Sequence, residues 1–142
     1  MNTIHSKSFE QTEKIAFDLA QTLNKGDVIA LFGEMGAGKT AFVRGLAKGL
    51  GLSDRVSSPT FAIVHDYSGQ LIHFDMYRID SWDSLYSTGY YDYLDMNAII
   101  VIEWSENIEN ALPPEHIRVE INKTADENER IITIGKNNEL NI

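Results

Sequence analysis

The chain has 142 residues, contains no cysteine, and carries 21 acidic against 12 basic residues, for a formal net charge of −9. The lack of cysteine excludes disulfides, thiolate metal sites and thiol redox chemistry, and the acidic charge argues against direct binding of nucleic acid, which relies on Lys and Arg. The length fits one domain, residues 1–142. No apolar run approaches the ~20 residues that span a membrane, so we expect a cytoplasmic protein without membrane association.

The first half of the chain predicts a helix, a buried strand and a second helix. Ser8 followed by Gln11 is typical of a helix N-terminus, and an apolar stripe then continues to a helix end near residues 24–26. Residues 28–32 are apolar without alternation, as expected of a strand covered on both faces. After a glycine-rich loop, apolar residues at helical spacing continue to residues 49–51, where two glycines end the second helix.

The second half of the chain predicts mainly strands. Residues 61–67 and 71–77 are strand-like runs separated by a Ser-Gly turn, which indicates a hairpin. A short helix, a continuous apolar strand and an alternating strand pair are expected at residues 81–88, 98–102, 117–121 and 130–134. The order of elements predicts a parallel core with an antiparallel pair appended at its C-terminal end.

The loop between the first strand and the second helix carries the most specific motif. It fits the pattern G-x-x-x-x-G-K-[ST], in which glycines permit positive φ angles and several backbone N–H groups point into one concavity that holds a polyphosphate. The residues expected to bind the phosphates are Gly33, Glu34, Met35, Gly36, Ala37, Gly38, Lys39 and Thr40. A strand, this loop and a helix in succession predict an α/β fold that is P-loop NTPase-like, with a mostly parallel central sheet flanked by helices and appended antiparallel strands.

The loop and a later strand predict a magnesium nucleotide site. We expect Lys39 to reach the β- and γ-phosphates, and Thr40 to offer its hydroxyl to Mg²⁺. The second metal ligand should follow a neighbouring parallel strand, where open α/β sheets bind ligands, and Glu103 directly follows the apolar run 98–102. Most proteins of this class carry Asp there, so Glu103 would bind the ion directly or through water. The alternative is a solvated carboxylate at a strand end.

Further candidates lie in two segments between the loop and Glu103. His73, Asp75 and Tyr77 alternate on one face of a predicted strand. Asp75 is a candidate to position or deprotonate the attacking water or to hold a metal-bound water, and Arg78 to neutralise the γ-phosphate or to pair with a carboxylate. Thr60 follows a proline and fits a loop whose hydroxyl senses the γ-phosphate. The plainer alternatives are a structural histidine, a surface ion pair and an ordinary turn residue.

Four motifs occur in the order and approximate spacing of one known family. They are the phosphate loop, Ser58-Pro59-Thr60-Phe61, His73-Phe74-Asp75-Met76-Tyr77-Arg78 and Ile102-Glu103-Trp104. Together they cover about residues 8 to 134 and closely resemble the bacterial TsaE (YjeE) family, small P-loop ATPases needed for the threonylcarbamoyladenosine modification of tRNA. One departure is Glu34-Met35, where an Asp-Leu pair is common in the family.

The resemblance implies residue roles. The segment Gly36–Thr40 would bind the phosphates of ATP, and Thr40 and Glu103 would coordinate Mg²⁺. Lys39 and Asp75 would be the catalytic residues, with Asp75 as the favoured carboxylate. Weak Mg²⁺-dependent ATP hydrolysis, stimulated by a partner, is the activity that follows.

The resemblance also implies partners. Thr60 would belong to a switch-like loop, and Trp104 would lie beside the nucleotide and the partner surface, unless it is a core aromatic residue. The family docks on the TsaB–TsaD complex and hydrolyses ATP to support repeated turnover, so tRNA would be contacted only indirectly. The acidic net charge of the chain agrees with this division of labour.

Three other functions remain as alternatives. A small P-loop kinase of a nucleotide or metabolite uses the same loop, but it usually needs an arginine-bearing lid, and no Arg-rich insertion occurs here. A GTP switch usually carries Asn-Lys-x-Asp, which residues 122–125 fail to match at the fourth position. A binding module with negligible turnover is the third. For contacts to adenine, residues 8–12 and Arg130 are the candidates.

Overall fold

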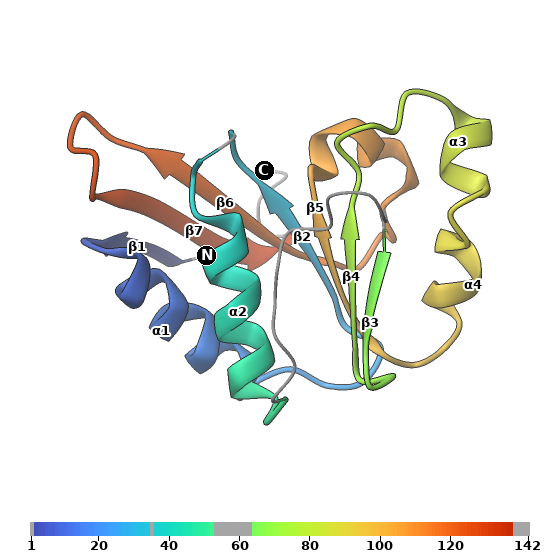
Figure 1. Cartoon of the computed structure of the whole chain (residues 1–142), viewed down its shortest axis with the longest axis horizontal. Helices are drawn as coiled ribbons and strands as arrows, with labels where there is room; N and C mark the ends of the chain where they lie inside the picture. The colour runs from blue at the N-terminus through green and yellow to red at the C-terminus, as the bar shows by residue number, and fades with distance from the viewer. Residues whose placement is uncertain (1, 35, 53–63, 138–142) are drawn as a thin grey trace.

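The computed structural model describes residues 2–34, 36–52 and 64–137. These residues form a seven-stranded sheet in the order β1-β7-β6-β2-β5-β4-β3 (Figure 1). The strands are β1 (Asn2–Ser6), β2 (Val28–Phe32), β3 (Val64–Tyr67), β4 (Leu71–Asp75), β5 (Ile99–Glu103), β6 (Ile117–Lys123) and β7 (Arg130–Lys136). The helices are α1 (Phe9–Ala20), α2 (Lys39–Gly49), α3 (Trp82–Tyr86), α4 (Tyr90–Leu94) and the 3₁₀ helix η1 (Ser105–Ala111).

The centre of the sheet is parallel and its edges are antiparallel. β2 pairs in parallel with β5 and β6, and β5 pairs in parallel with β4. β3 and β4 form the predicted hairpin, and β7 pairs antiparallel with β6. The predicted fold class is therefore confirmed. The N-terminal strand β1, which pairs antiparallel with β7, was not predicted, because five half-exposed residues carry no strong periodicity.

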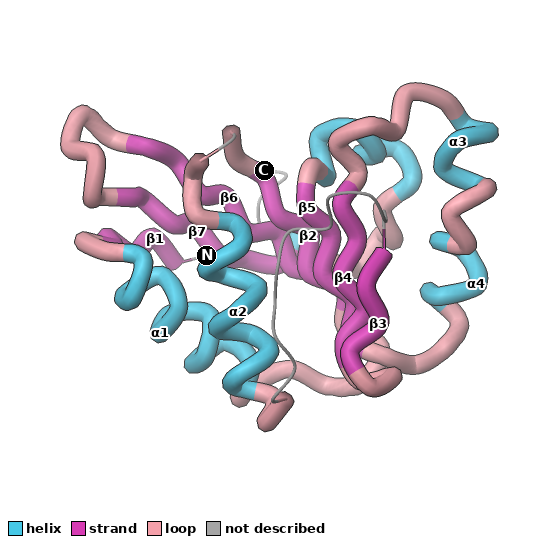
Figure 2. Tube along the Cα trace, in the orientation of Figure 1, coloured by secondary structure: helices cyan, strands magenta, loops and turns pink. Residues whose placement is uncertain are grey.

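Helices cover both faces of this sheet. α1 and α2 lie side by side on one face (Figure 2), and their contacts are the most numerous between any two elements. On the opposite face, Leu85 of α3, Tyr90 of α4 and Ile108 of η1 share a buried cluster with Phe74 and Ile102 of the sheet. Among the described residues, no helix combines the length and apolarity needed to cross a bilayer.

The first helix begins as predicted and ends earlier. The Ser8 hydroxyl accepts a hydrogen bond from the Gln11 N–H at 3.1 Å, and the Gln11 side chain accepts from the Lys7 N–H at 2.7 Å. The regular helix ends at Ala20 and not near residues 24–26. The reason is that the next N–H groups bond to carbonyls three residues back, which tightens the chain into turns.

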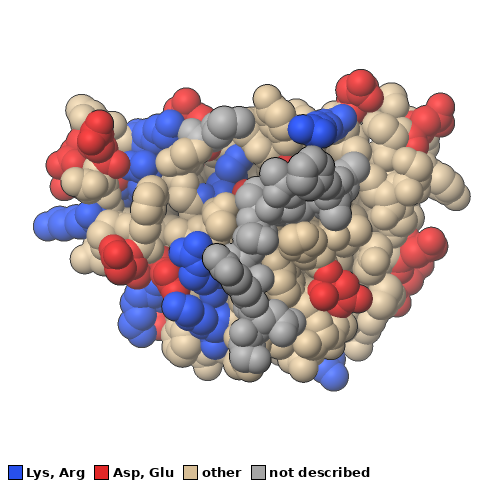
Figure 3. Space-filling model, viewed as in Figure 1, with Lys and Arg blue, Asp and Glu red and all other residues tan. Residues whose placement is uncertain are grey.

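Close packing joins α1 to α2. A Cβ atom on Gly45 would lie 2.1 Å from the Glu13 carbonyl oxygen, so only glycine permits this approach. At the rim of the contact, Glu13 pairs with Arg44 at 3.8 Å and with Lys48. Basic and acidic side chains accordingly lie mixed over the two helices (Figure 3). The small basic face of α2 is thus matched by an acid on α1.

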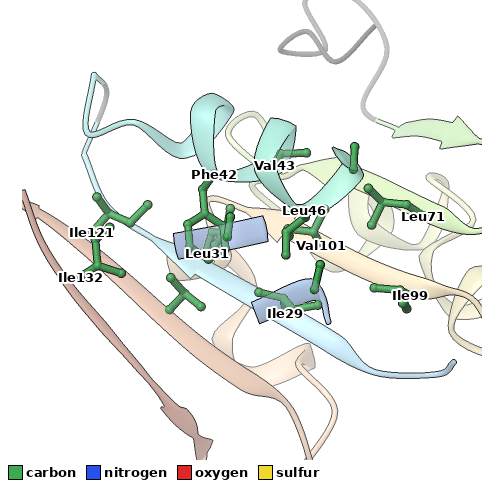
Figure 4. Close-up of a cluster of buried hydrophobic side chains, with 14 of the residues drawn as sticks. Ile29, Leu31, Phe42, Val43, Leu46, Leu71, Ile99, Val101, Ile121 and Ile132 are labelled. Carbon is green, nitrogen blue, oxygen red and sulfur yellow. The ribbon is translucent and has the colours of Figure 1, made fainter. Parts of the chain in front are cut away.

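The core between α2 and the sheet holds both ends of the phosphate loop. Phe42, Val43 and Leu46 of α2 are fully buried in one cluster with Leu31 of β2 and Val101 of β5 (Figure 4). Burial of each such side chain contributes about 1.5–3 kcal/mol. Since the loop directly connects β2 to α2, this packing fixes where the loop starts and where it ends.

Two elements of the second half differ from the sequence expectation. β4 ends at Asp75, two residues before the predicted end, because the chain turns there and the Ile79 N–H bonds to the Met76 carbonyl. The helix predicted over residues 81–88 is the shorter α3. The helices α4 and η1 were not predicted, since each is only a turn or two long.

We expect Gly45→Ala to lower the free energy of unfolding by about 1–3 kcal/mol, because the new methyl group forces α1 and α2 apart. Chemical denaturation measures this difference. The matched control is Glu10→Ala, an exposed position on α1, which should change stability by less than about 0.5 kcal/mol. A Gly45→Ala variant as stable as the unmodified chain would contradict the close packing.

Candidate nucleotide-binding site

A cavity of about 480 Å³ lies at the carboxyl ends of the parallel strands, beside the first turn of α2. The residues that line it are Phe9, Gly36, Gly38, Lys39, Thr40, Ala41, Arg44, Asp75, Tyr77, Glu103 and Trp104. The structure thus brings together residues from the loop, from β4 and from β5, which lie well apart in the sequence.

The start of α2 opens into this cavity. Gly38 precedes the helix with a φ of 106°, a conformation that L side chains rarely adopt, and no side chain caps the helix. The first N–H groups of a helix have no partner within the helix, and the helix dipole adds partial positive charge there. The geometry therefore suits an anion such as a phosphate.

Arg130 holds the outer side of the loop. Its guanidinium donates to the carbonyl oxygens of Ala37 at 3.0 Å and Gly36 at 3.1 Å, and the side chain is buried. In a trans peptide the C=O and the N–H of the next residue point in opposite directions. Because the Ala37 carbonyl points toward Arg130, the Gly38 N–H points away from Arg130. Arg130 thus supports the loop, and a contact with adenine stays a prediction from the sequence.

Lys39 is held at the edge of the cavity. Its Nζ donates to the Gly33 carbonyl at 2.6 Å and lies 3.6 Å from the centre of the Trp104 ring. Burial lowers the pKa of Lys39, whereas the nearby carboxylates of Glu103 and Glu106 oppose that shift. An ammonium group has three N–H donors, so two remain for a ligand.

Two carboxylates stand side by side on adjacent strands. Asp75 and Glu103 are register partners at the ends of β4 and β5. Asp75 Oδ1 accepts the Tyr77 N–H at 3.0 Å, which fixes the side chain at the strand end. Burial raises the pKa of Asp75, and the neighbouring Glu103 adds to the rise, while the hydrogen bond from Tyr77 acts against it.

Glu103 is oriented from behind by a histidine. His73 Nε2 and Glu103 Oε2 lie 2.5 Å apart, and both side chains are buried. His73 therefore does not line the cavity; it holds the carboxylate that does. Its other ring nitrogen, Nδ1, has no hydrogen-bond partner among the described residues. The expected alignment of His73 beside Asp75 is present, and Tyr77 follows in the turn after β4.

Trp104 follows Glu103 in an unusual conformation. Its φ is 58° and its ψ is 42°, in the left-handed region that a bulky residue rarely occupies. This backbone bends the chain from β5 into η1 and lets the ring line the cavity, 5.0 Å from the Tyr77 ring. Strained residues cluster at binding sites, so the conformation supports a functional position for Trp104.

The remaining predicted residues lie elsewhere. Arg78 is exposed in the turn after β4 and is not among the residues that line the cavity. Glu34 is exposed, and Thr60 and Met35 lie outside the described residues. Sequence reasoning missed one contact of the loop: the Glu106 carboxylate accepts the Gly33 N–H at 3.0 Å. No sequence pattern indicates this pairing.

The residues present fit a magnesium ion that is shared with phosphates. The Thr40 hydroxyl and the Glu103 carboxylate both line the cavity, and oxygen donors are what Mg²⁺ prefers. The described residues contain no cluster of three or more His, Cys, Asp or Glu side chains that would hold a metal alone. Such a site supplies one or two protein ligands and leaves the others to phosphate and water.

The parallel core, the loop between β2 and α2 and the acidic strand ends define a P-loop NTPase-like α/β fold. The family model described as "Threonylcarbamoyl adenosine biosynthesis protein TsaE" matches residues 6–132. The chain belongs to the TsaE family.

Individual relatives agree with this assignment. The tRNA threonylcarbamoyladenosine biosynthesis protein TsaE of Rickettsia prowazekii is 39% identical over 99% of this chain and 97% of its own length. The protein of the same name from Bacillus subtilis is 39% identical over 87% of this chain and 78% of its own length. The crystal structure of YdiB from Bacillus subtilis superposes with a TM-score of 0.75 at 30% identity, covering 97% of this chain and 87% of that one.

We expect Asp75→Asn to stabilise the fold at neutral pH. Burial raises the pKa of Asp75 in the folded state above the ordinary value of 3.8. As the pH rises through these two values, the unfolded chain loses its proton more readily than the folded chain, so the free energy of unfolding falls. The whole of this loss is present at pH 7. Asparagine removes the charge and keeps the acceptor for the Tyr77 N–H. Asp75 is partly exposed, so solvent screening limits the gain to about 1 kcal/mol.

Chemical denaturation at pH 7 and pH 3 measures the gain, which should vanish at pH 3. The control is Asp18→Asn, an exposed carboxylate on α1 that pairs with Lys14, which should give no gain at pH 7. A gain that persists at pH 3, or a loss at pH 7, would show that burial does not penalise the charge of Asp75.

Proposed function

We propose that this chain binds ATP with Mg²⁺ and hydrolyses it as an accessory subunit of tRNA threonylcarbamoyladenosine biosynthesis. The observation that carries the proposal is the single cavity in which the start of α2, Lys39, Thr40, Asp75 and Glu103 meet. Relatives that match nearly the whole chain are named for this biosynthesis. The proposal combines that role with the chemistry of the cavity.

The residues divide the work of hydrolysis. The N–H groups at the start of α2 and the Lys39 ammonium bind the triphosphate, and the Thr40 hydroxyl and Glu103 carboxylate hold Mg²⁺. The ion, when bound, withdraws charge from the phosphate oxygens. Asp75 orients the attacking water and accepts its proton as the water oxygen bonds to the γ-phosphorus and ADP leaves. The raised pKa of Asp75 suits this role as a base.

Four residues have narrower roles in the proposal. Trp104 packs against Lys39 and forms a wall of the cavity beside the phosphates. Thr60 senses the γ-phosphate from a switch-like loop. Arg78 contacts the γ-phosphate only if the turn after β4 carries its exposed side chain toward the cavity. Phe9 extends the cavity from the N-terminal side and is a candidate to contact the base.

The proposed partner is the TsaB–TsaD complex, and tRNA is reached only through it. The net charge of −9 disfavours direct binding of tRNA phosphates. Turnover by the isolated chain is expected to be slow, because the one arginine that lines the cavity within the described residues, Arg44, is on α2 and pairs with Glu13. A group supplied by the partner would then stabilise the charge of the transition state.

The test compares phosphate release from ATP by the isolated chain and by the chain with purified TsaB and TsaD. We expect slow release alone and an increase of at least about 10-fold with the partners. Lys39→Ala should remove activity in both cases, whereas Lys14→Ala, an exposed lysine on α1, should keep it. Asp75→Asn should bind ATP with unchanged affinity and hydrolyse it at least about 100-fold more slowly.

Other outcomes have defined meanings. Release by Lys39→Ala equal to that of the unmodified chain would remove the loop from the mechanism. Transfer of the γ-phosphate to a nucleotide or metabolite would support a small kinase. ATP binding with no release, alone or with the partners, would support a binding module. Binding is followed by the fluorescence of Trp104 in a Trp82→Phe background, since the chain has two tryptophans.

A further inference from the structure

A second hollow lies between α3 and η1. This α3–η1 groove is formed by residues 79–82, 85 and 106–111 and has a volume of about 460 Å³. Within the described part of the chain, it shares no lining residue with the nucleotide cavity. Its lining is mixed: the buried side chains of Ile79, Leu85 and Ile108 lie at its base, and polar and acidic side chains form most of the rest. The groove therefore offers a hollow of mixed polarity that the proposed ATP site does not use.

The groove and its surroundings are acidic. Asp80, Glu106 and Glu109 line it, and no Lys or Arg among the described residues does. The chain from residue 79 to residue 117 contains eight acidic residues and no basic one. In the view of Figure 3, the surface over α3 and α4 accordingly shows acidic and uncharged side chains and no basic ones. Electrostatic complementarity favours a positively charged occupant.

Exposed aromatic rings stand at the rim. Trp82 lines the groove and is 63% exposed, and Tyr86, one turn further along α3, is 68% exposed. Both rings rest against Tyr91 of α4, with centroids 5.8 and 5.9 Å away. Trp and Tyr dominate the binding energy of protein interfaces, and their faces attract guanidinium and ammonium groups. This combination suits a protein partner with basic side chains.

The 3₁₀ helix η1, which forms one side of the groove, also contacts elements of the nucleotide site. η1 directly follows Glu103 and Trp104, and its Glu106 carboxylate accepts the Gly33 N–H of the phosphate loop. Its Asn107 side chain donates to the carbonyls of Met76 at 2.9 Å and Tyr77 at 3.0 Å, in the turn after Asp75. A partner seated in the groove therefore touches the element that holds the loop and both catalytic strand ends.

We propose that the α3–η1 groove is the docking site for a basic protein segment, with an Arg or Lys set over Trp82 and beside the carboxylates of the groove. The inference rests on the proposed function and deepens it, because the segment belongs to the TsaB–TsaD complex. A second copy of this chain is disfavoured as occupant, since it would bring further negative charge to an acidic surface. Phosphates of nucleic acid are disfavoured for the same reason.

The test measures the dissociation constant of the chain for immobilised TsaB–TsaD at low and high salt. Trp82→Ala and Asp80→Lys should each weaken binding at least 10-fold at low salt, and Asp80→Lys should also reduce the salt dependence. The matched controls on α1 are Phe17→Ala and Asp18→Lys, an exposed aromatic residue and an exposed acid, which should change binding less than 3-fold. Both groove variants should keep the ATP affinity and melting temperature of the unmodified chain.

Each other outcome is decisive. If the unmodified chain binds and both groove variants bind equally well, the docking site is wrong and the proposed function stands. If the unmodified chain does not bind TsaB–TsaD at all, the proposed partner is wrong and this inference falls with it. If sedimentation shows a dimer of the chain that Trp82→Ala dissociates, the occupant is a second copy, which contradicts the basic segment proposed here.

Discussion

Parallel pairing of β2, β5 and β4 is the constraint on which the rest of the structure depends. The pairing brings the carboxyl ends of three strands to one edge, so that the phosphate loop after β2, Glu103 of β5 and Asp75 of β4 meet around one cavity. The residues concerned lie far apart in the chain, and no local interaction would bring them together. Burial of both sheet faces under helices supplies the free energy that holds the edge in place.

Polar contacts then give the edge its shape. Arg130 binds the outer carbonyls of the loop, Glu106 binds the Gly33 N–H, and His73 orients Glu103 from within the core. The Arg130 and His73 contacts are buried, so their loss would leave a partner unsatisfied at a cost of about 1–3 kcal/mol each, whereas the Glu106 contact is exposed to solvent. The described ends of the loop and the Glu103 carboxylate are thus positioned by side chains of the protein itself.

The elements with strong local patterns were predicted from the sequence, and those fixed by distant contacts were not. β2 and the apolar run of β5 are continuous hydrophobic stretches, and the loop has a specific glycine pattern. These patterns predict the fold class and the presence of Thr40 and Glu103 at the same site. β1 depends on pairing with β7, and η1 on the left-handed turn at Trp104. The support from Arg130 joins residues more than 90 positions apart, which no spacing in the sequence reveals.

A crystal structure of the chain with a non-hydrolysable ATP analogue and Mn²⁺ tests the central claim most directly. Anomalous scattering locates the manganese ion in place of magnesium. The account predicts a triphosphate against the N–H groups at the start of α2 and a manganese ion between the Thr40 hydroxyl and the Glu103 carboxylate, bound directly or through water. A triphosphate bound elsewhere, or an ion remote from Glu103, would contradict it.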